Sequence, residues 1–107
     1  MSEVRILDLA DAPKEGEAKQ VIFEHPFTEI NYALGVFFAK DRYWAITDLC
    51  KKCDSSLGLG KVSGMYAFCA REQHAWHIKT GLYKFDRSLS TPIYRITVKD
   101  EGLFIDI

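Results

Sequence analysis

The sequence contains no run of about 18 apolar residues, the length that a membrane-spanning helix needs. Its first residues also lack the basic segment followed by an apolar segment that marks a signal peptide. We therefore expect a soluble, cytoplasmic protein that does not bind a membrane. Internal repeats, low-complexity tracts and convincing amphipathic helices are absent as well. The organisation of the chain must therefore come from short-period hydrophobic patterns and turn residues.

The length and composition are those of a small globular protein. The 107 residues suit a single domain spanning 1–107, and 48% of them are hydrophobic and 27% charged. The net charge is only -1, yet residues 1–30 carry three basic and seven acidic side chains, whereas residues 50–90 carry seven basic and three acidic ones. The basic region could face an acidic partner protein. A pI of about 6.3 argues against nucleic acid as that partner.

Apolar residues alternate with polar ones along most of the chain, which predicts strands. The segments concerned are 4–7, 19–24, 30–40, 43–47, 65–68, 76–78, 93–98 and 103–107. We expect a turn at Asp41 and Arg42, and a closing hairpin around Gly102. The prediction is an all-β fold, a small antiparallel barrel or sandwich, from which two loops project at 49–60 and 69–75. Five aromatic residues are expected to fill its interior: Phe37, Phe38, Trp44, Phe68 and Tyr94.

Residues that can bind metals are concentrated in these two loops. They form a Cys-x2-Cys pair followed by Cys-x4-His-x2-His, at Cys50, Cys53, Cys69, His74 and His77. Thiolate and imidazole groups suit zinc and iron-sulfur centres, and three cysteines with one histidine would complete one four-ligand site. No second Cys-x2-Cys pair is present, so the zinc pattern is incomplete. A cytosolic protein would keep these thiols reduced rather than form a disulfide framework.

The spacing across both loops resembles the Rieske domain of small Rieske-type ferredoxins. The two cysteine positions of that family fall on Cys50 and Cys69, nineteen residues apart. Further matches surround them, at Ala45, Leu57, Gly60, Gly64, Trp76, Thr80, Gly81 and Pro92. The resemblance covers most of the chain. It implies a Rieske-like β-fold and, in the family, a 2Fe-2S cluster held by two cysteines and two histidines.

The two histidine positions of the family are occupied differently in this sequence, by Lys52 and Glu72. Neither side chain normally replaces imidazole on a cluster iron, and a protonated lysine would repel a nearby cation. The standard two-cysteine, two-histidine ligation is therefore not expected.

Three hypotheses remain for this site. In the first, the site holds no metal and Lys52 forms an ion pair with Glu72. This would resemble the small subunit of assimilatory NAD(P)H nitrite reductases, a branch of the Rieske fold that has lost its cluster ligands and serves as an accessory subunit.

In the second hypothesis the ligands are displaced along the loops. Cys50, Cys53, Cys69 and His74 would then hold a non-standard iron-sulfur cluster or a single zinc ion. His77 is a weaker candidate, because strand alternation turns it away from Trp76.

In the third hypothesis Cys50 and Cys69 form a reversible disulfide, or one of them acts as a nucleophile whose pKa is lowered by nearby basic residues.

These observations together predict a small ferredoxin-like component of a multicomponent oxidoreductase. It would act in electron transfer or as an accessory subunit, docking on an oxidoreductase, oxygenase or reductase partner rather than working as an enzyme alone. The alternatives are a cluster-free protein-interaction module and a zinc-binding domain that uses Cys50, Cys53, Cys69 and His74. Both alternatives depend on whether these four residues meet in space.

Overall fold

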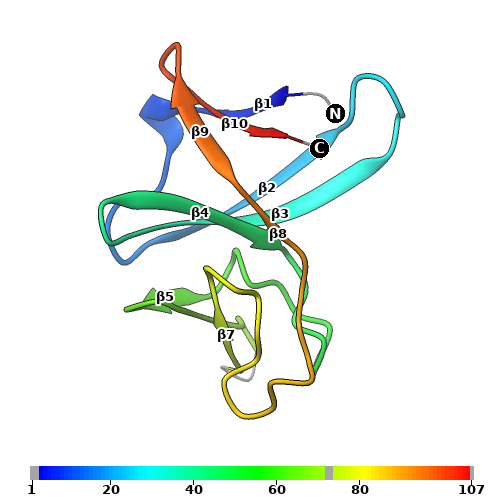
Figure 1. The fold of residues 1–107 in the computed structure, drawn as a ribbon, viewed down its shortest axis with the longest axis vertical. Helices are drawn as coiled ribbons and strands as arrows, with labels where there is room; N and C mark the ends of the chain where they lie inside the picture. Colours follow the sequence, from blue (N-terminus) through cyan, green and yellow to red (C-terminus); the bar gives the residue numbers. More distant parts are fainter. Residues whose placement is uncertain (1–2, 72–73, 107) are drawn as a thin grey trace.

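The structure, a computed structural model, describes residues 3–71 and 74–106 (Figure 1). It is built from antiparallel strands, as the sequence pattern predicts, and its one helical segment in the described residues is the 3-10 turn η1. The elements, in chain order, are β1 (Glu3–Asp8), η1 (Leu9–Asp11), β2 (Ala18–Glu24), β3 (Asn31–Ala39), β4 (Arg42–Thr47), β5 (Lys61–Ser63), β6 (Tyr66–Phe68), β7 (Ala75–His77), β8 (Ile93–Tyr94), β9 (Ile96–Lys99) and β10 (Gly102–Asp106). The predicted all-β fold class is confirmed.

The strands form three sheets, with the orders β1-β10-β9, β2-β3-β4-β8 and β5-β6-β7. We call the first two sheets the body and the third sheet, with the loops around it, the lobe. In Figure 1 the sheet β1-β10-β9 lies above, and the lobe below, the sheet that contains β3 and β4. That sheet therefore contributes side chains to two cores.

The alternation of side chains along β3 explains how one sheet serves both cores. Leu34 and Val36 lie in the body core, where they pack with buried apolar residues of β1 and β10. Phe37 and Ala39 belong to the other core, where they meet the lobe. Burial of apolar surface on both faces thus fixes β3 in the centre of the molecule.

The lobe is built from much shorter elements. β5, β6 and β7 have three residues each, whereas β3 has nine. The lobe core contains Leu57, Val62, Trp76 and Ile78, and also two buried cysteines. So few paired residues leave the arrangement of the lobe dependent on its loops.

Three details differ from the sequence-based expectations. The turn between β3 and β4 lies at Lys40 and Asp41, one residue earlier than predicted. The expected strand at 93–98 is divided at Arg95, because its first part pairs with β4 and its second part with β10. The three-residue strand β5 was not predicted.

The expected aromatic interior is also wrong in part. Phe37 is fully buried, but the other four residues are only half-buried. Phe38 follows Phe37 in the same strand and must face the other way, where it contacts Tyr43 at 4.7 Å between ring centroids. Alternation therefore prevents both phenylalanines from entering one core.

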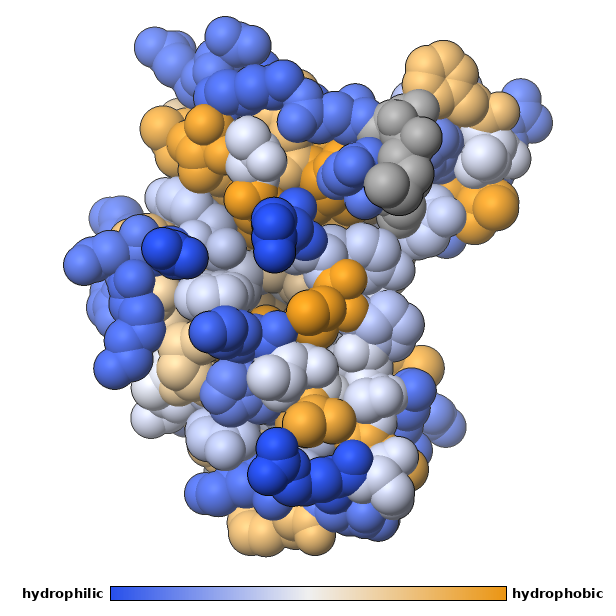
Figure 2. Space-filling model, in the orientation of Figure 1, coloured by the Kyte–Doolittle hydropathy of each residue, from blue (hydrophilic) through white to orange (hydrophobic). Residues whose placement is uncertain are grey.

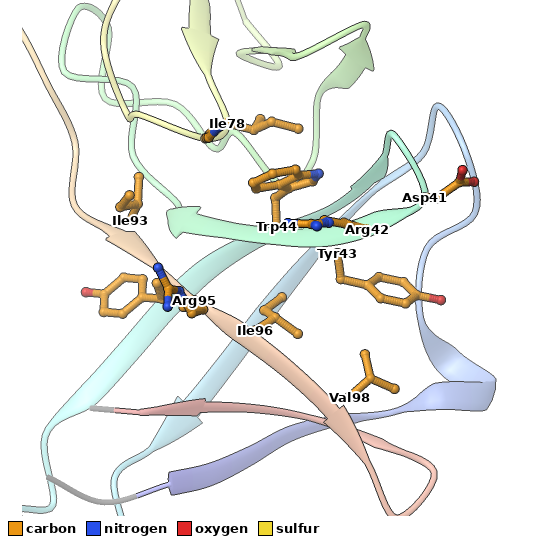
Figure 3. Close-up of a pocket in the computed structure, with 11 residues that line it drawn as sticks. Asp41, Arg42, Tyr43, Trp44, Ile78, Ile93, Arg95, Ile96 and Val98 are labelled. Atoms are coloured by element: carbon orange, nitrogen blue, oxygen red, sulfur yellow. The ribbon is translucent and has the colours of Figure 1, made fainter.

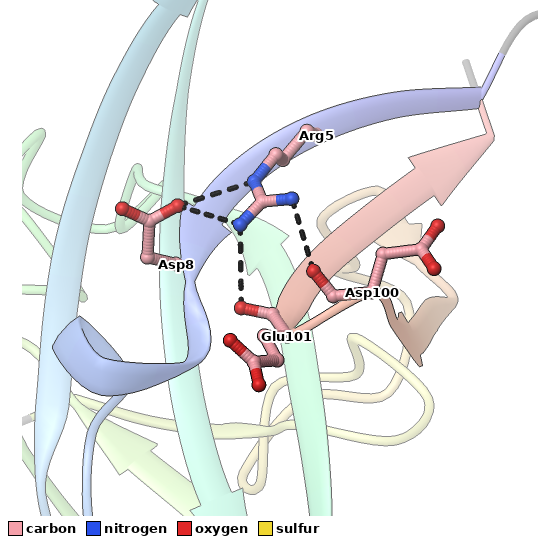
Figure 4. Close-up of polar contacts among 4 residues, drawn as sticks. All are labelled: Arg5, Asp8, Asp100 and Glu101. Atoms are coloured by element: carbon pink, nitrogen blue, oxygen red, sulfur yellow. Dashed lines mark hydrogen bonds and ion pairs between the residues drawn. The ribbon is translucent and has the colours of Figure 1, made fainter.

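Arg5 joins β1 to the turn of the closing hairpin (Figure 4). Its guanidinium donates to the Asp8 carboxylate at 2.8 and 3.1 Å. It also donates to the carbonyl oxygens of Asp100 and Glu101, at 3.2 and 3.3 Å. Both turn residues have positive φ, so these contacts hold a strained turn against the edge of the sheet.

The surface carries isolated apolar residues. Figure 2 shows small separate apolar patches among charged side chains on the face viewed there. Among residues 3–71 and 74–106, no helix has the length and apolar character required to cross a membrane.

Candidate metal centre

The first loop follows β4 and folds back on itself directly after Cys50. The Cys50 carbonyl oxygen accepts hydrogen bonds from the backbone N–H groups of Cys53, at 3.3 Å, and Asp54, at 2.7 Å. Asp54 has φ 62°, a left-handed conformation that aspartate tolerates better than most residues. The turn brings the Cys53 side chain back toward Cys50.

A buried carboxylate anchors this loop to the body. Asp48 accepts hydrogen bonds from the Gln20 side chain, at 2.6 Å, and from the Ser56 hydroxyl, at 2.7 Å. The backbone N–H of Gly58 donates to the same carboxylate. Asp48 is thus satisfied despite its burial, as a buried charge must be. Sequence analysis missed this residue, because an aspartate in a loop carries no signal of burial.

The second loop begins at Cys69 and is held against the first. The Cys69 sulfur accepts a hydrogen bond from the His74 backbone N–H at 3.2 Å, and the Cys69 N–H donates to the His74 carbonyl oxygen at 3.0 Å. The Ala70 N–H donates to the Ser56 carbonyl oxygen at 3.0 Å and joins the two loops. At Gly60 the loops approach so closely that a Cβ atom would lie 1.8 Å from the Phe68 carbonyl oxygen.

These two loops bring together four potential metal ligands, which we call the thiol–imidazole cluster: Cys50, Cys53, Cys69 and His74. Their ligand atoms all lie within 4.8 Å of one another. The His74 Nδ1 atom is 3.4 Å from the Cys50 sulfur and 3.7 Å from the Cys69 sulfur. The sulfurs of Cys53 and Cys69 are 3.6 Å apart. Cys50 and Cys69 are buried, and the other two residues are half-buried.

Three of the six separations are close to the edges of a tetrahedron around one ion. Zinc bonds of about 2.3 Å to sulfur and about 2.0 Å to nitrogen place two sulfurs about 3.8 Å apart, and a sulfur and a nitrogen about 3.5 Å apart. The separations of 3.6 Å between the Cys53 and Cys69 sulfurs, and of 3.4 and 3.7 Å between sulfur and nitrogen, lie close to both figures. The cluster thus has the ligand number and chemistry of a Cys3His site, and three of its six ligand pairs have the spacing of one.

Neighbouring polar groups orient the sulfurs. The Trp76 indole N–H donates to the Cys50 sulfur at 3.3 Å, and the Ser55 hydroxyl lies 3.0 Å from the Cys53 sulfur. Burial raises the pKa of the Cys50 thiol, while the Trp76 hydrogen bond acts in the opposite direction. Contacts of this kind fix ligand orientation in metal sites. Sequence analysis placed Trp76 at the aromatic position of the family pattern but did not predict its hydrogen bond to Cys50.

The other predicted site residues lie outside this cluster. Lys52 is exposed, and its Nζ atom lies 5.7 Å from the centroid of the Tyr83 ring. Glu72 falls outside the described residues, so the predicted ion pair with Lys52 stays a prediction. His77 packs edge-on against Tyr66, with 5.2 Å between ring centroids, and its Nδ1 accepts from the Lys79 and Thr80 N–H groups. It points away from the cluster, as alternation requires.

The standard ligation of a Rieske 2Fe-2S cluster does not fit these residues. One of the two histidine positions holds Lys52, which contacts an aromatic ring instead. In addition, a 2Fe-2S centre separates its two ligand pairs by two irons and two bridging sulfides, whereas the four ligand atoms here are close enough to share one ion. All three cysteines are free thiols in this structure, and the reversible disulfide between Cys50 and Cys69 stays a prediction.

Comparisons with known proteins place the fold. No family model and no curated protein sequence matches the chain. Among solved structures, a ferredoxin of Sphingomonas yanoikuyae B1 is similar over 99% of both chains, with 23% identity and a TM-score of 0.81. A protein described as the NADH-dependent nitrite reductase small subunit of Mycobacterium tuberculosis is 14% identical, with a TM-score of 0.76 over 97% of this chain and 92% of its own.

A third similar structure is the ferredoxin in a complex with the oxygenase of carbazole 1,9a-dioxygenase. It is 17% identical, with a TM-score of 0.75 over 96% of this chain and 91% of its own. Identities this low establish shape and not activity. The chain therefore has, over nearly its whole length, the Rieske-like fold of these ferredoxins and nitrite reductase small subunits.

Proposed function

We propose that this protein is an accessory component of a multicomponent oxidoreductase, and that its thiol–imidazole cluster binds one tetrahedral zinc ion. The observation that carries the proposal is the mutual distance of the four ligand atoms, all within 4.8 Å. A bound zinc ion would link the two loops and thereby stabilise the lobe, whose strands are only three residues long. Zinc has no redox chemistry, so its role here is structural.

The accessory role is supported by the fold and by Lys52, which occupies one of the two histidine positions of the family and lies over the Tyr83 ring. Similar structures include nitrite reductase small subunits and a ferredoxin bound to an oxygenase, which are components of larger assemblies. A component that holds zinc instead of a 2Fe-2S cluster would contribute a docking surface rather than electrons. The basic residues around the lobe would suit an acidic partner surface.

The test is the metal and acid-labile sulfide content of protein purified without air and without added metal. We expect one zinc ion per chain, no labile sulfide and no visible colour. Two irons and two sulfides per chain would overturn the single-ion site, and metal-free protein that takes up no zinc would overturn metal binding altogether.

Variants sharpen this test. Cys53→Ser and His74→Ala each remove one ligand and should weaken zinc affinity by at least about tenfold to a hundredfold in a competition titration with a chromophoric chelator. Lys52→Ala is the matched control, because Lys52 lies in the same loop, between Cys50 and Cys53, but its side chain lies over the Tyr83 ring. Its zinc affinity should stay within about twofold of the original.

Electron transfer by iron bound to the same cluster is a second candidate. It is favoured by the two cysteines at the family positions and by the ferredoxins among the similar structures. Iron in a thiolate-rich site would colour the protein and give a reversible redox couple. The visible absorption of the protein would then change reversibly on reduction and reoxidation. Such a change in the original protein, and its loss in Cys53→Ser, would support this candidate over zinc.

A further inference from the structure

The closing hairpin leaves one edge of β9 open. Its turn residues Asp100 and Glu101 have φ of 48° and 58°, which is the two-residue type I′ geometry. In such a hairpin the flanking pair, Lys99 and Gly102, exchanges backbone hydrogen bonds, and the bonded pairs then alternate along the ladder. The N–H and C=O groups of Ile96 and Val98 therefore point away from β10, toward the free edge.

The same reasoning places an open backbone position on β4. Lys40 and Asp41 have φ of 54° and 61°, so the ladder between β3 and β4 begins with the same hairpin geometry. The backbone groups of Tyr43 and Thr47 then face away from β3. At Thr47 this is seen directly, because its N–H donates to the Pro92 carbonyl oxygen at 2.9 Å.

Tyr43 has no such neighbour, because the ladder between β4 and β8 ends at the pair of Ala45 and Tyr94. Beyond this pair the chain turns away at Arg95 and joins β10 instead. Within the described residues, no second strand is paired with the outward side of β4 at Tyr43, nor with that of β9 at Ile96. The chain therefore pairs with β4 at β8 and diverges from it at β9. This leaves unpaired backbone groups on both β4 and β9.

A groove of about 690 Å³ occupies the space where these strands separate. Figure 3 shows Tyr43 extending from β4 toward β9, with Ile96 and Val98 on the opposite side. Trp44 points to the other face of β4, toward Ile78. The apolar side chains of Ile93 and Val98 are 47% and 50% exposed. None of the lining residues belongs to the thiol–imidazole cluster.

The charges around the groove are mostly positive. Arg42, Lys79 and Arg95 line it and are exposed, whereas Asp41 is the one acidic residue in its lining. Exposed apolar β-branched residues, open backbone donors and acceptors, and cations at the rim together suit an extended, acidic segment of a polypeptide. Natural proteins usually protect such an edge, so an open one calls for an occupant.

We propose that an acidic, extended segment of a partner protein binds in this groove and adds a strand to the free edge of β9. Backbone hydrogen bonds to Ile96 and Val98 would supply the pairing, and alternate apolar side chains of the segment would contact Ile93 and Val98. Carboxylates on the segment would face Arg42 and Arg95. This contact is independent of the metal proposal, because the groove and the cluster share no residue.

The experiment selects linear dodecapeptides from a random display library on the immobilised full-length protein. We expect enrichment of peptides in which apolar residues alternate and acidic residues outnumber basic ones. The most enriched peptide is then synthesised and titrated into 15N-labelled protein. Its binding should shift the amide signals of Tyr43, Ile96 and Val98 more than those of the lobe.

Two variants separate strand addition from simple apolar contact. Val98→Pro removes the outward N–H at an edge position, where proline is tolerated, and should weaken peptide binding at least tenfold. Val98→Ala keeps that N–H and should weaken binding less than Val98→Pro does. Arg95→Glu should weaken binding of the acidic peptides and not that of a neutral analogue. Far-UV circular dichroism of each variant confirms that it folds.

Several outcomes would overturn the proposal. These are no enrichment above a blank support, equal binding to Val98→Pro and the unmodified protein, or amide shifts confined to the lobe. A concentration-dependent dimer in sedimentation that Val98→Pro abolishes would also overturn it, by showing that a second copy of the chain occupies the edge. Methylated peptides provide a second measurement. A peptide whose backbone nitrogens are methylated at the alternate residues that pair with β9 should bind at least tenfold more weakly than the unmethylated peptide.

Discussion

The body and the lobe are held together by different means. The body core is entirely apolar, and its strands reach nine residues, with continuous ladders from β2 to β4. The lobe has three strands of three residues, and its core includes Cys50 and Cys69. Burial of apolar surface is enough to explain the body. The lobe instead relies on close loop contacts, and the proposed zinc ion would add a further link between its two loops.

A substitution in the body core should give the largest loss of stability without affecting the cluster. Leu34 is completely buried in β3, so Leu34→Ala should reduce the free energy of unfolding by about 2–5 kcal/mol. Urea denaturation measures this loss. The metal content per folded chain should stay unchanged. A variant that loses metal in proportion to stability would contradict the separation of body and lobe.

Gly60 provides the corresponding test in the lobe, where a substitution should weaken both stability and metal binding. Gly60→Ala places a Cβ atom 1.8 Å from the Phe68 carbonyl oxygen, so the two loops must move apart. We expect a loss of about 1–3 kcal/mol in urea denaturation, together with weaker metal binding in a chelator competition.

Gly64→Ala is the control for a glycine substitution in the lobe. Gly64, unlike Gly60, has a positive φ of 59°, and no atom lies within 4 Å of the added Cβ. It should cost about 1 kcal/mol and leave metal binding unchanged. Equal metal affinity in both variants would show that loop contact at Gly60 does not position the cluster.

His77 links the stability of the lobe to pH. Burial, followed by the charges of Lys79 and Arg87, lowers the pKa of His77 below its ordinary value of 6.5. A histidine with a lowered pKa stabilises the fold above pH 6.5, and this contribution is lost as the pH falls through the lower, folded-state pKa. Stability should therefore decrease below about pH 6.5.

His77→Asn keeps an acceptor for the backbone N–H groups but does not titrate, so its loss of stability over the same pH range should be smaller. Parallel stability curves for the two proteins between pH 7 and pH 5 would contradict this assignment. The titration of the His77 ring by NMR gives an independent reading of the direction of the shift.

Arg5 should show the smallest effect. Its contacts with Asp8 and with the hairpin turn lie on the surface of the body (Figure 4). Arg5→Ala should therefore cost no more than about 1 kcal/mol in urea denaturation, and less at high salt. A loss comparable with that of Leu34→Ala would mean that the turn, rather than the apolar core, fixes the closing hairpin.

Much of the body could be predicted from the sequence, because period-two alternation is strong in the segments that became β3, β4 and β10. β5 could not, since three residues are too few to show a period. The division of the expected strand at Arg95 was also hidden, because alternation continues across it while the pairing partner changes. The groove depends on that change and has no signal of its own in the sequence.

The candidate site was predicted in its composition but not in its geometry. One of the three hypotheses drawn from the cysteine and histidine spacing named these four residues as ligands. The structure brings their ligand atoms together. What the spacing could not show is that the turn after Cys50 carries Cys53 inward, since this depends on the left-handed conformation of Asp54. The role of Glu72 remains a prediction.

X-ray absorption spectroscopy of the metal in the purified protein tests the single-ion site most directly. We predict a zinc edge whose first shell contains three sulfurs at about 2.3 Å and one nitrogen at about 2.0 Å. The Cys53→Ser variant should lose one sulfur from that shell. An iron edge with a second iron among the scattering neighbours, or a shell of oxygen atoms alone, would contradict the proposal.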